Sequence, residues 1–288
     1  MTKTTVKKSR AERLRNLFIR GLINLLLALP YRWRVPLCGW VMAYIIGPIA
    51  GYDKRVRDNL ALVMPDLPQA EVKRLMREVP RNVGRTLIEI YSGKEFIARA
   101  TAEPLQGEGL AALDEAHAAG RPVILVTGHF GNYDASRAAL IARGYNVGAL
   151  YRPMGDPDFN AHYVKAISRI GTPVFPRGRA GLADMVRFLR GGGMLGLLMD
   201  QKISSGQPLS FMGQPAMTAL SAADLALKYN ALVVPTYAVR RGLDFDIIIE
   251  PPIPHSTPTE MTQALNDSLE KLVRQHMDQW FWIHRRWK

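Results

Sequence analysis

The stretch RPVILVTGHFGNYDASRAALIARG, residues 121–144, contains the transition from a buried strand to a helix. Its first part, RPVILVTG, is a continuous apolar run that is rich in β-branched residues and bounded by turn formers, which predicts a strand covered on both faces. Its last part, DASRAALIARG, is predicted to be a helix that ends at Gly144. A histidine, two glycines and an aspartate therefore lie where the strand gives way to the helix.

The chain continues this alternation toward its end. Further strands are predicted at 146–153, 172–177, 194–201, 231–241 and 244–253, helices at 159–171, 181–193, 219–230 and 261–286, and a loop or hairpin at 207–218. This pattern is typical of an α/β fold with a largely parallel central sheet flanked by helices. Sites in such sheets lie beyond the carboxyl ends of the strands, where both His129 and Asp200 are expected.

The N-terminal region differs in composition from the rest. Residues 1–34 contain nine Lys or Arg and one acid, Glu12, around the apolar stretch LFIRGLINLLLALP at 17–30, and a second apolar run, 35–52, is uncharged. Basic helices with an apolar face suit the cytoplasmic face of an anionic membrane. We therefore expect residues 1–52 to associate with that membrane and 53–288 to form a second domain, with a helical lead-in at 53–120 and an α/β core at 121–288. Burial of both apolar runs in the core is the alternative, and spanning and interfacial anchoring are both open.

Composition excludes several classes of protein. The 288 residues are 48% hydrophobic and 22% charged, as in folded proteins. The single cysteine, Cys38, excludes an internal disulfide framework and is expected to be a packed side chain. No metal-ligand spacing or Gly-rich phosphate loop occurs, so we expect no metal and no cofactor. The net charge of +13 also suits a nucleic-acid-binding protein, the non-enzyme alternative, but the charge clusters around an apolar segment and no nucleic-acid-binding motif is present.

The spacing of His129 and Asp134 suggests a catalytic pair. On one continuous helix the two side chains would point apart, so His129 must precede the helix, with Asn132 as the N-cap and Asp134 in the first turn. The carboxylate would then hold one imidazole nitrogen and leave the other basic, as in a general base that typically contributes ~10²–10⁴ in rate. An ordinary turn histidine and first-turn acid are the alternative. Because no nucleophile elbow is present, the base should activate a hydroxyl of the substrate.

GHFGNYD, residues 128–134, resembles the His-x-x-x-x-Asp/Glu signature of the glycerolipid acyltransferases. The chain most resembles the branch of lipid A late acyltransferases, through further motifs in the same order along nearly the whole chain: RVRDNLALVMP (55–65), YRP (151–153), SRIG (168–171), LLMDQ (197–201), FMGQPAMT (211–218) and QWFWIHRRWK (279–288). The resemblance implies an enzyme on the cytoplasmic face of the inner membrane. It would transfer an acyl chain from a thioester, usually on acyl carrier protein, to a hydroxyl of a lipid A precursor.

The resemblance also assigns roles to residues. It makes His129 the general base, Asp134 its orienting carboxylate, Arg169 an arginine required for activity and Asp200 the acid of an Asp-Gln pair. The lipid A branch usually has Glu where this chain has Asp134, so another membrane acceptor, a lysophospholipid or a different glycolipid, is the alternative.

Other groups are candidates for the remaining steps. The tetrahedral oxyanion needs preorganised donors, for which we consider the backbone N–H groups around Gly131 and Asn132 and the guanidinium groups of Arg152 and Arg169. The two arginines could instead bind phosphates of the acceptor. Asp200 could bind a sugar hydroxyl or pair with an arginine. Four arginines suit an acidic carrier protein or a solvated helix face: Arg177, Arg179, Arg187 and Arg190. The tryptophans at 280, 282 and 287 suit a membrane interface, RNA stacking or burial.

Overall fold

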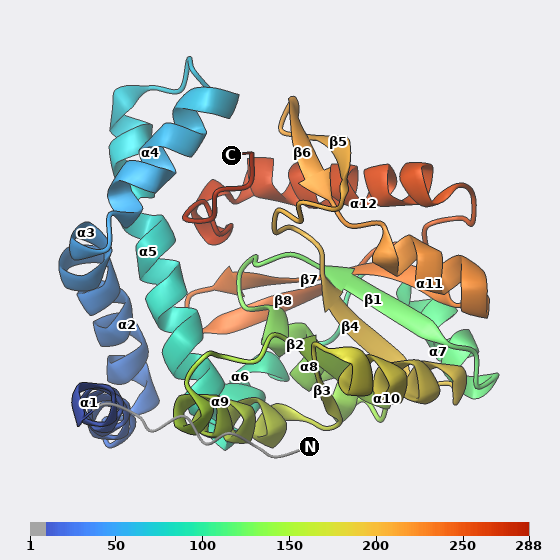
Figure 1. The fold of residues 1–288 in the computed structure, drawn as a ribbon, viewed down its shortest axis with the longest axis horizontal. Helices are drawn as coiled ribbons and strands as arrows, with labels where there is room; N and C mark the ends of the chain where they lie inside the picture. Colours follow the sequence, from blue (N-terminus) through green and yellow to red (C-terminus); the bar gives the residue numbers. More distant parts are fainter. Residues whose placement is uncertain (1–9, 288) are drawn as a thin grey trace.

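The structure, a computed structural model, describes residues 10–287 and is built on a six-stranded sheet (Figure 1). The strand order is β3–β2–β4–β1–β7–β8, with β8 antiparallel to β7 and all other neighbours parallel. The strands are β1 (Val123–Thr127), β2 (Val147–Tyr151), β3 (Val174–Pro176), β4 (Met194–Leu198), β7 (Leu232–Arg241) and β8 (Asp244–Ile249). A separate hairpin joins β5 (Gln207–Phe211) to β6 (Gln214–Thr218). The predicted α/β class with a largely parallel sheet is confirmed.

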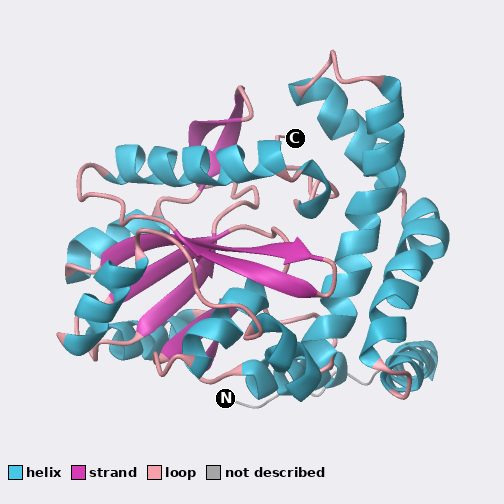
Figure 2. Ribbon diagram, turned by 180° about the vertical axis from the view of Figure 1, so that it is seen from behind, coloured by secondary structure: helices cyan, strands magenta, loops and turns pink. Residues whose placement is uncertain are grey.

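Helices cover both faces of the sheet, as Figure 2 shows from behind. Alternate residues of β1 point to opposite faces. Val123 and Leu125 pack in a core that includes α8 (Tyr133–Ala142) and α9 (Pro157–Ile170). Ile124 and Val126 pack in another that includes helices α10 (Arg179–Arg190), α11 (Ser221–Tyr229) and α12 (Pro258–Gln275). A strand buried on both faces needs an uninterrupted apolar run, which is why VILV could be recognised in the sequence.

A helical region precedes the sheet and includes the helical lead-in predicted at 53–120. It consists of α1 (Arg10–Leu27), α2 (Tyr31–Val41), the π-helix η1 (Met42–Ile46), α3 (Gly47–Ile49), α4 (Tyr52–Val63), α5 (Gln69–Tyr91), α6 (Lys94–Ala100) and α7 (Leu110–Ala118). Helix α2 packs along α5 (Figure 1). A Cβ atom at Gly84 would lie 2.6 Å from the Cys38 carbonyl oxygen, so glycine permits this close approach. Cys38 itself is buried, as expected of a packed side chain.

Apolar side chains are exposed mainly at the N-terminal end of the described chain. Among residues 16–287, sixteen large hydrophobic side chains are exposed, and eleven of them fall between Leu17 and Ile49. Leu17, Phe18 and Ile49 are 70%, 71% and 85% exposed. Among residues 10–287, no single helix has both the length and the apolar character needed to cross a bilayer. The segments Tyr31–Ile49 and Tyr52–Val63 meet this test only together, with a bend of 84° between them.

The last helix is shorter than predicted. Helix α12 ends at Gln275, and a short 3-10 turn, η2 (Met277–Gln279), leads into an irregular tail. In this tail Trp280 and Trp282 are 1% and 0% exposed, with their ring centroids 4.8 Å apart in an edge-to-face arrangement. The prediction of a helix to residue 286 is wrong because the chain must leave the helical path to bury both rings. Their burial also excludes these two residues from a membrane interface.

Candidate active site

His129 and Asp200 meet at the edge of the sheet. His129 lies two residues after the end of β1, and Asp200 lies two residues after the end of β4. The two strands are parallel neighbours, with Thr127 opposite Leu198. Their carboxyl ends therefore bring the two side chains together, although the residues are 71 positions apart in the sequence.

The Asp200 carboxylate makes contacts with three groups. Its Oδ1 lies 2.7 Å from Nδ1 of His129, and its Oδ2 accepts hydrogen bonds from the His129 backbone N–H at 2.7 Å and from the Trp280 indole N–H at 2.9 Å. Burial raises the pKa of Asp200, but the His129 contacts and the indole N–H outweigh it and hold the pKa below its ordinary value. The ionised carboxylate makes Nδ1 of His129 the donor, so Nε2 carries the lone pair.

Asp134 does not orient His129 in the structure. Its Oδ1 accepts hydrogen bonds from Nε of Arg137 at 2.8 Å and lies 2.7 Å from Nη2 of the same residue. Asp134 is in the first turn of α8, as predicted. Arg137, three positions further along, is its neighbour on the helix surface, so the carboxylate contacts Arg137 and not His129 in the preceding loop. The predicted pairing of His129 with Asp134 is therefore wrong for this structure, and Asp200 has the orienting position. Asp134 nevertheless contributes to the wall of a cavity that His129 also lines.

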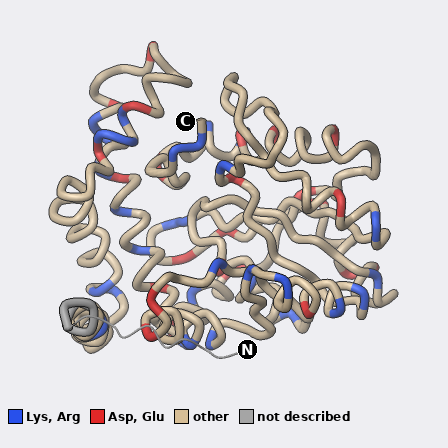
Figure 3. The backbone as a smooth tube through the Cα atoms, viewed as in Figure 1, with Lys and Arg blue, Asp and Glu red and all other residues tan. Residues whose placement is uncertain are grey.

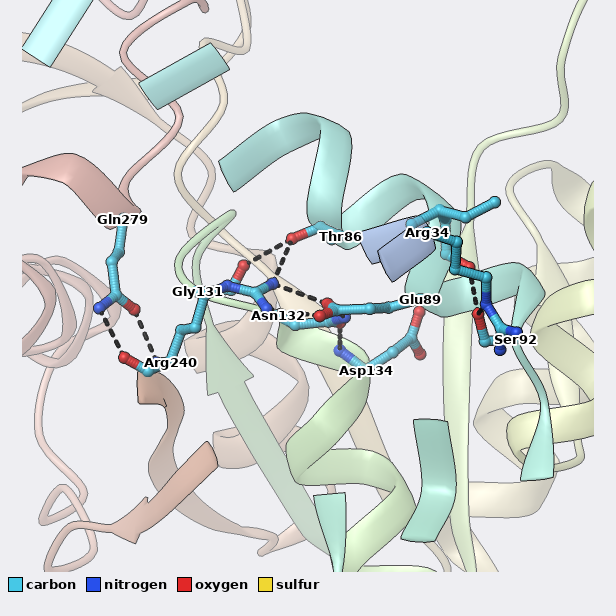
Figure 4. Close-up of polar contacts among 10 residues, drawn as sticks. Arg34, Thr86, Glu89, Ser92, Gly131, Asn132, Asp134, Arg240 and Gln279 are labelled. Atoms are coloured by element: carbon cyan, nitrogen blue, oxygen red, sulfur yellow. Dashed lines mark hydrogen bonds and ion pairs between the residues drawn. The ribbon is translucent and has the colours of Figure 1, made fainter. Parts of the chain in front are cut away.

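A buried network fixes the loop between His129 and α8 (Figure 4). Asn132 caps α8, as predicted: its Oδ1 accepts from the Asp134 backbone N–H at 3.1 Å. Its Nδ2 donates to Glu89 at 2.8 Å, and Glu89 also accepts from Arg240, whose Nη2 lies 2.6 Å from Oε2. The Glu89 and Arg240 side chains are 0% and 3% exposed, so this ion pair is held rigidly behind the loop.

Gly131 has a structural role. Its φ is +53°, and a Cβ there would lie 1.9 Å from the Ala238 carbonyl oxygen, so only glycine fits. Its N–H donates to the Gln279 carbonyl oxygen at 2.9 Å and its carbonyl oxygen accepts from the Thr86 hydroxyl at 2.9 Å. The prediction that the Gly131 N–H stabilises an oxyanion is wrong, because that N–H is already engaged.

His129 lies at the junction of two cavities. The first, of about 350 Å³, extends beneath the loop between the sheet, α8 and α9, and its wall includes Leu125, Leu140, Val147, Leu150, Ile167 and Leu198. The second, of about 300 Å³, lies against α5 and the C-terminal tail, and its wall includes Val83, Leu87, Ile90, Met154 and Phe281. Both cavities are largely apolar. Each is lined by His129, Tyr133, Tyr163 and Gln201.

Polar groups surround the outer edge of the His129 ring. Nε2 of Gln201 lies 3.3 Å from Nε2 of His129. Burial raises the pKa of Tyr133 well above its ordinary value and also raises that of Tyr163, and the two hydroxyls hydrogen-bond to each other. Both tyrosines are therefore neutral, and because one proton is used within the pair, one hydroxyl proton remains to donate at the junction of the cavities.

The two predicted arginines occupy different places. Arg152 follows β2 and lines the first cavity together with His129, as expected of a group that contacts substrate. Arg169, near the end of α9, lines a separate pocket with residues of α1 and lines neither His129 cavity. The prediction that Arg169 acts at the His129 site is not supported by this arrangement. Asp200 pairs with His129 and not with an arginine.

Several site residues escaped sequence reasoning. Glu89 and Arg240 are 151 positions apart, and Trp280 reaches Asp200 from 80 positions away. Two of the residues carried a signal, because Gln201 follows Asp200 in the LLMDQ motif and Trp280 belongs to the QWFWIHRRWK motif, but neither motif predicted a contact with the site. Among the residues that the structure describes, no group of three or more His, Cys, Asp or Glu is arranged to hold a metal ion.

Comparison with known proteins identifies the family. A model of the bacterial lipid A biosynthesis acyltransferases matches residues 6–288. The chain belongs to this family. In this structure the motif GHFGNYD lies at the turn between β1 and α8.

Curated relatives agree with this assignment. The chain is 25% identical to the lipid A biosynthesis lauroyltransferase of Escherichia coli over 82% of this chain and 78% of the relative. It is 24% identical to the lipid A biosynthesis acyltransferase of Haemophilus influenzae, over 90% and 83%. It is also 24% identical to the phosphatidylinositol mannoside acyltransferase of Mycobacterium tuberculosis, over 82% and 78%. This member of the lipid A acyltransferase family is therefore an acyltransferase of lipid A or related glycolipid biosynthesis.

Proposed function

We propose that this enzyme transfers a fatty acyl group from an acyl thioester to a hydroxyl of a lipid A precursor, with His129 as general base and Asp200 as its orienting carboxylate. The contact of 2.7 Å between Nδ1 of His129 and Oδ1 of Asp200 supports this most directly. It favours the tautomer in which Nε2 carries the lone pair and can accept a proton. The His129 side chain is 26% exposed, so this nitrogen is accessible from the cavities.

The reaction follows from that tautomer. Nε2 of His129 accepts the hydroxyl proton as the acceptor oxygen attacks the thioester carbonyl carbon, which forms a tetrahedral oxyanion. Collapse of the intermediate breaks the C–S bond, and the leaving thiolate takes the proton back from the imidazolium. The products are an ester and a free thiol. Asp200 remains ionised and stabilises the imidazolium during the step.

Oxyanion stabilisation is assigned to side chains around the ring. Gln201 and Arg152 line the first cavity with His129 and can donate to an oxygen beside Nε2. One hydroxyl of the hydrogen-bonded Tyr133–Tyr163 pair is a third donor at the same junction. The backbone N–H of Asn132 remains a candidate donor, held in place by the side chain of the same residue, which caps α8 and binds Glu89.

The two cavities suit two lipid substrates. We assign the acyl chain of the donor to the first cavity, whose walls between the sheet and α9 are mostly aliphatic. The acceptor then enters through the second cavity, where the exposed side chains of Leu87 and Met154 lie at the rim. Acyl carrier protein, an acidic partner, is the proposed donor, and the exposed Arg177, Arg179 and Arg190 offer it a basic surface.

The test is His129→Ala. We expect the purified variant to lose at least ~10²-fold in acyl transfer from acyl carrier protein while retaining the wild-type melting temperature. His129→Gln is the matched control for ring volume and polarity, and it should be equally inactive because an amide is no base. Turnover within a few-fold of wild type in either folded variant would contradict the proposal.

A related glycolipid is the second candidate acceptor. It is favoured by the match to a phosphatidylinositol mannoside acyltransferase, which is as similar to this chain as the lipid A enzymes are. Mass spectrometry of lipids from cells with and without the gene separates the two. Loss of one acyl chain from lipid A supports the first acceptor, whereas unchanged lipid A with an altered glycolipid supports the second.

We also propose that residues 1–52 attach the enzyme to the cytoplasmic face of the inner membrane. The exposed apolar side chains of α1, α2 and η1 support this, since large exposed apolar patches mark interaction surfaces. Truncation is a poor test, because Arg34 is 2% exposed and contacts Ser92 and Glu95 of the main body.

Surface substitution leaves the fold intact. We expect Leu17→Gln combined with Phe18→Gln and Leu25→Gln to move the enzyme from the membrane fraction to the supernatant. Each buried apolar side chain contributes about 1.5–3 kcal/mol to such binding. The matched control is Leu62→Gln combined with Leu182→Gln and Leu227→Gln, three exposed leucines on other helices. Equal release of both triple variants, or of neither, would contradict the assignment.

A further inference from the structure

A second, basic pocket lies between α1 and α9, away from His129. Its volume is about 210 Å³, and its wall is formed by residues of α1, the last residue of α5 and α9: Arg20, Asn24, Leu27, Tyr91, His162, Lys165, Ala166 and Arg169. Helix α9 contributes to both sites, since Tyr163 and Ile167 line the cavity at His129. Arg169, which lines neither cavity at His129, lies in the wall of this pocket.

Three cations converge on this pocket. Arg20 comes from α1, and Lys165 and Arg169 come from α9. Among the described residues, none of the three forms a side-chain ion pair with a carboxylate. One acid is nearby: Asp158 lines an adjoining hollow together with Arg20 and Lys165. The described wall of the pocket itself holds three cations and no acid, whereas Figure 3 shows both basic and acidic positions around it.

The pocket wall also holds unused hydrogen-bonding groups. Tyr91 is 5% exposed, and its hydroxyl has no partner among the described residues. Nδ1 of His162 is likewise buried without a partner, and the two rings stack with centroids 5.0 Å apart. Burial lowers the pKa of His162, and the neighbouring charges of Arg20, Arg169 and Lys165 lower it further. A bound anion would relieve this repulsion.

The surface beside the pocket is apolar. On α1, Leu17, Phe18 and Leu25 are 70%, 71% and 68% exposed, and Arg20 is on the same helix. A ligand that fits both the basic pocket and the apolar surface beside it carries an anionic group next to a hydrocarbon chain. Arginine forks match phosphate oxygens in geometry, and lysine adds a point charge.

We propose that this pocket binds the phosphate group of an anionic lipid, whose acyl chains lie along the exposed apolar side of α1. The site goes beyond membrane association through apolar contacts, because it selects for a phosphate at a defined place. It does not depend on the reaction at His129. The lipid phosphate has two sources: a phospholipid of the membrane or a phosphorylated disaccharide lipid.

The test measures binding of the full-length protein to vesicles. Three compositions are compared: phosphatidylcholine alone, phosphatidylcholine with 30% phosphatidylglycerol, and phosphatidylcholine with 10% of a bisphosphorylated disaccharide lipid. The test variant is Lys165→Gln combined with Arg169→Gln. The matched control is Arg187→Gln combined with Arg190→Gln, which removes the same charge from the exposed surface of α10. Melting temperatures establish that both variants fold.

The expected result is a loss of at least tenfold in affinity for one or both anionic vesicles in the test variant, with less than a twofold change in the control. Loss confined to phosphatidylglycerol vesicles identifies a membrane phospholipid, and loss confined to the disaccharide lipid identifies that lipid. Equal losses in both variants, or none in either, would overturn the proposal, because binding would then follow total charge or ignore it.

A soluble probe tests the phosphate itself. Glycerol 1-phosphate should shift the His162 imidazole resonance of the wild-type enzyme saturably, and the shift should vanish in the test variant. Binding of this probe without any difference in vesicle binding would also overturn the lipid assignment, since the pocket would then hold a soluble anion. Neither measurement involves acyl transfer, so failure here is distinct from failure of the proposed reaction.

Discussion

Asp134 and Asp200 are both buried carboxylates near His129, but their surroundings give them different roles. Asp134 lies in the first turn of α8 and is bound by Arg137 from the next turn. Asp200 lies past the end of β4 and is bound by the His129 ring, the His129 backbone and the Trp280 indole. The first carboxylate is neutralised by a permanent cation. The second faces an imidazole, which in the proposed reaction gains and loses a proton.

This difference shows what a fixed spacing can and cannot predict. The His-x-x-x-x-Asp pattern predicted the location of the site, and the histidine, the N-cap and the first-turn aspartate all lie where it requires. It did not predict the partner of the histidine. That partner is set by the pairing of β1 with β4, which is a property of the sheet and not of the local sequence.

The largest effect is expected for Asp200→Asn. The amide would donate toward Nδ1 of His129 and force the proton onto Nε2, so the ring could no longer act as base. We expect turnover to fall by at least ~10²-fold in a folded protein. Steady-state kinetics with an acyl carrier protein thioester, alongside thermal melts, measure both quantities.

A double variant serves as the control for this pair. Because the two residues act as one unit, His129→Ala with Asp200→Asn should be no less active than His129→Ala alone. If the losses multiply, Asp200 has an effect independent of the ring and the dyad is not supported. Near-normal turnover of the single Asp200→Asn variant would have the same consequence.

Asp134→Asn should act in another way. It leaves the Arg137 guanidinium buried without its counter-charge, and breaking a buried pair costs about 3–5 kcal/mol. We therefore expect a clear loss in the free energy of unfolding. Turnover should fall by about tenfold, because the first turn of α8 would be displaced. Arg137→Gln should reproduce both effects, because it breaks the same pair from the other side. Denaturation curves and kinetics of the two variants provide the comparison.

One outcome would reverse the roles of the carboxylates. If Asp134→Asn is stable and as inactive as Asp200→Asn, while Arg137→Gln is harmless, then Asp134 faces the ring in the working enzyme. The sequence-based pairing would then describe the reacting state. The structure gives the opposite expectation, because the side chains of Asp134 and Arg137 are 8% and 6% exposed and hold each other.

The same reasoning explains which parts of the fold were predictable. Strands such as VILV and helices such as α8 were recognisable because burial on one or two faces leaves a periodic trace in the sequence. The tail was not, since Trp280 and Trp282 depart from the helix to fill a cluster with Phe211, whose ring centroid is 5.2 Å from that of Trp280. Arg169 was predicted at the wrong site because the face of α9 that carries it is covered by α1, and the packing of α1 leaves no local pattern in the sequence.

The smallest effect concerns the tail that braces the Asp200 side of the site. Nε2 of His284 accepts a hydrogen bond from the Lys202 backbone N–H at 2.9 Å, which requires the neutral ring. Burial lowers the pKa of His284, and the His129, Arg286 and Lys202 charges add to this, although Asp200 opposes it. The unfolded chain therefore binds a proton at this position more readily than the folded protein does.

The sign of the pH dependence follows. The stability that neutral His284 contributes is present above the ordinary histidine pKa of about 6.5 and is lost as the pH falls from there through the lower folded-state pKa. His284→Gln keeps an acceptor for Lys202 but cannot titrate, so its melting temperature should fall less than that of the wild type between pH 7 and pH 5. The expected difference is on the order of 1 °C. His117→Gln on α7 is the control and should follow the wild-type curve. If His117→Gln reduces the pH dependence of the melting temperature as much as His284→Gln does, the tail is not the source of the acid sensitivity. The contribution of the tail to holding Asp200 would then come from Trp280 alone.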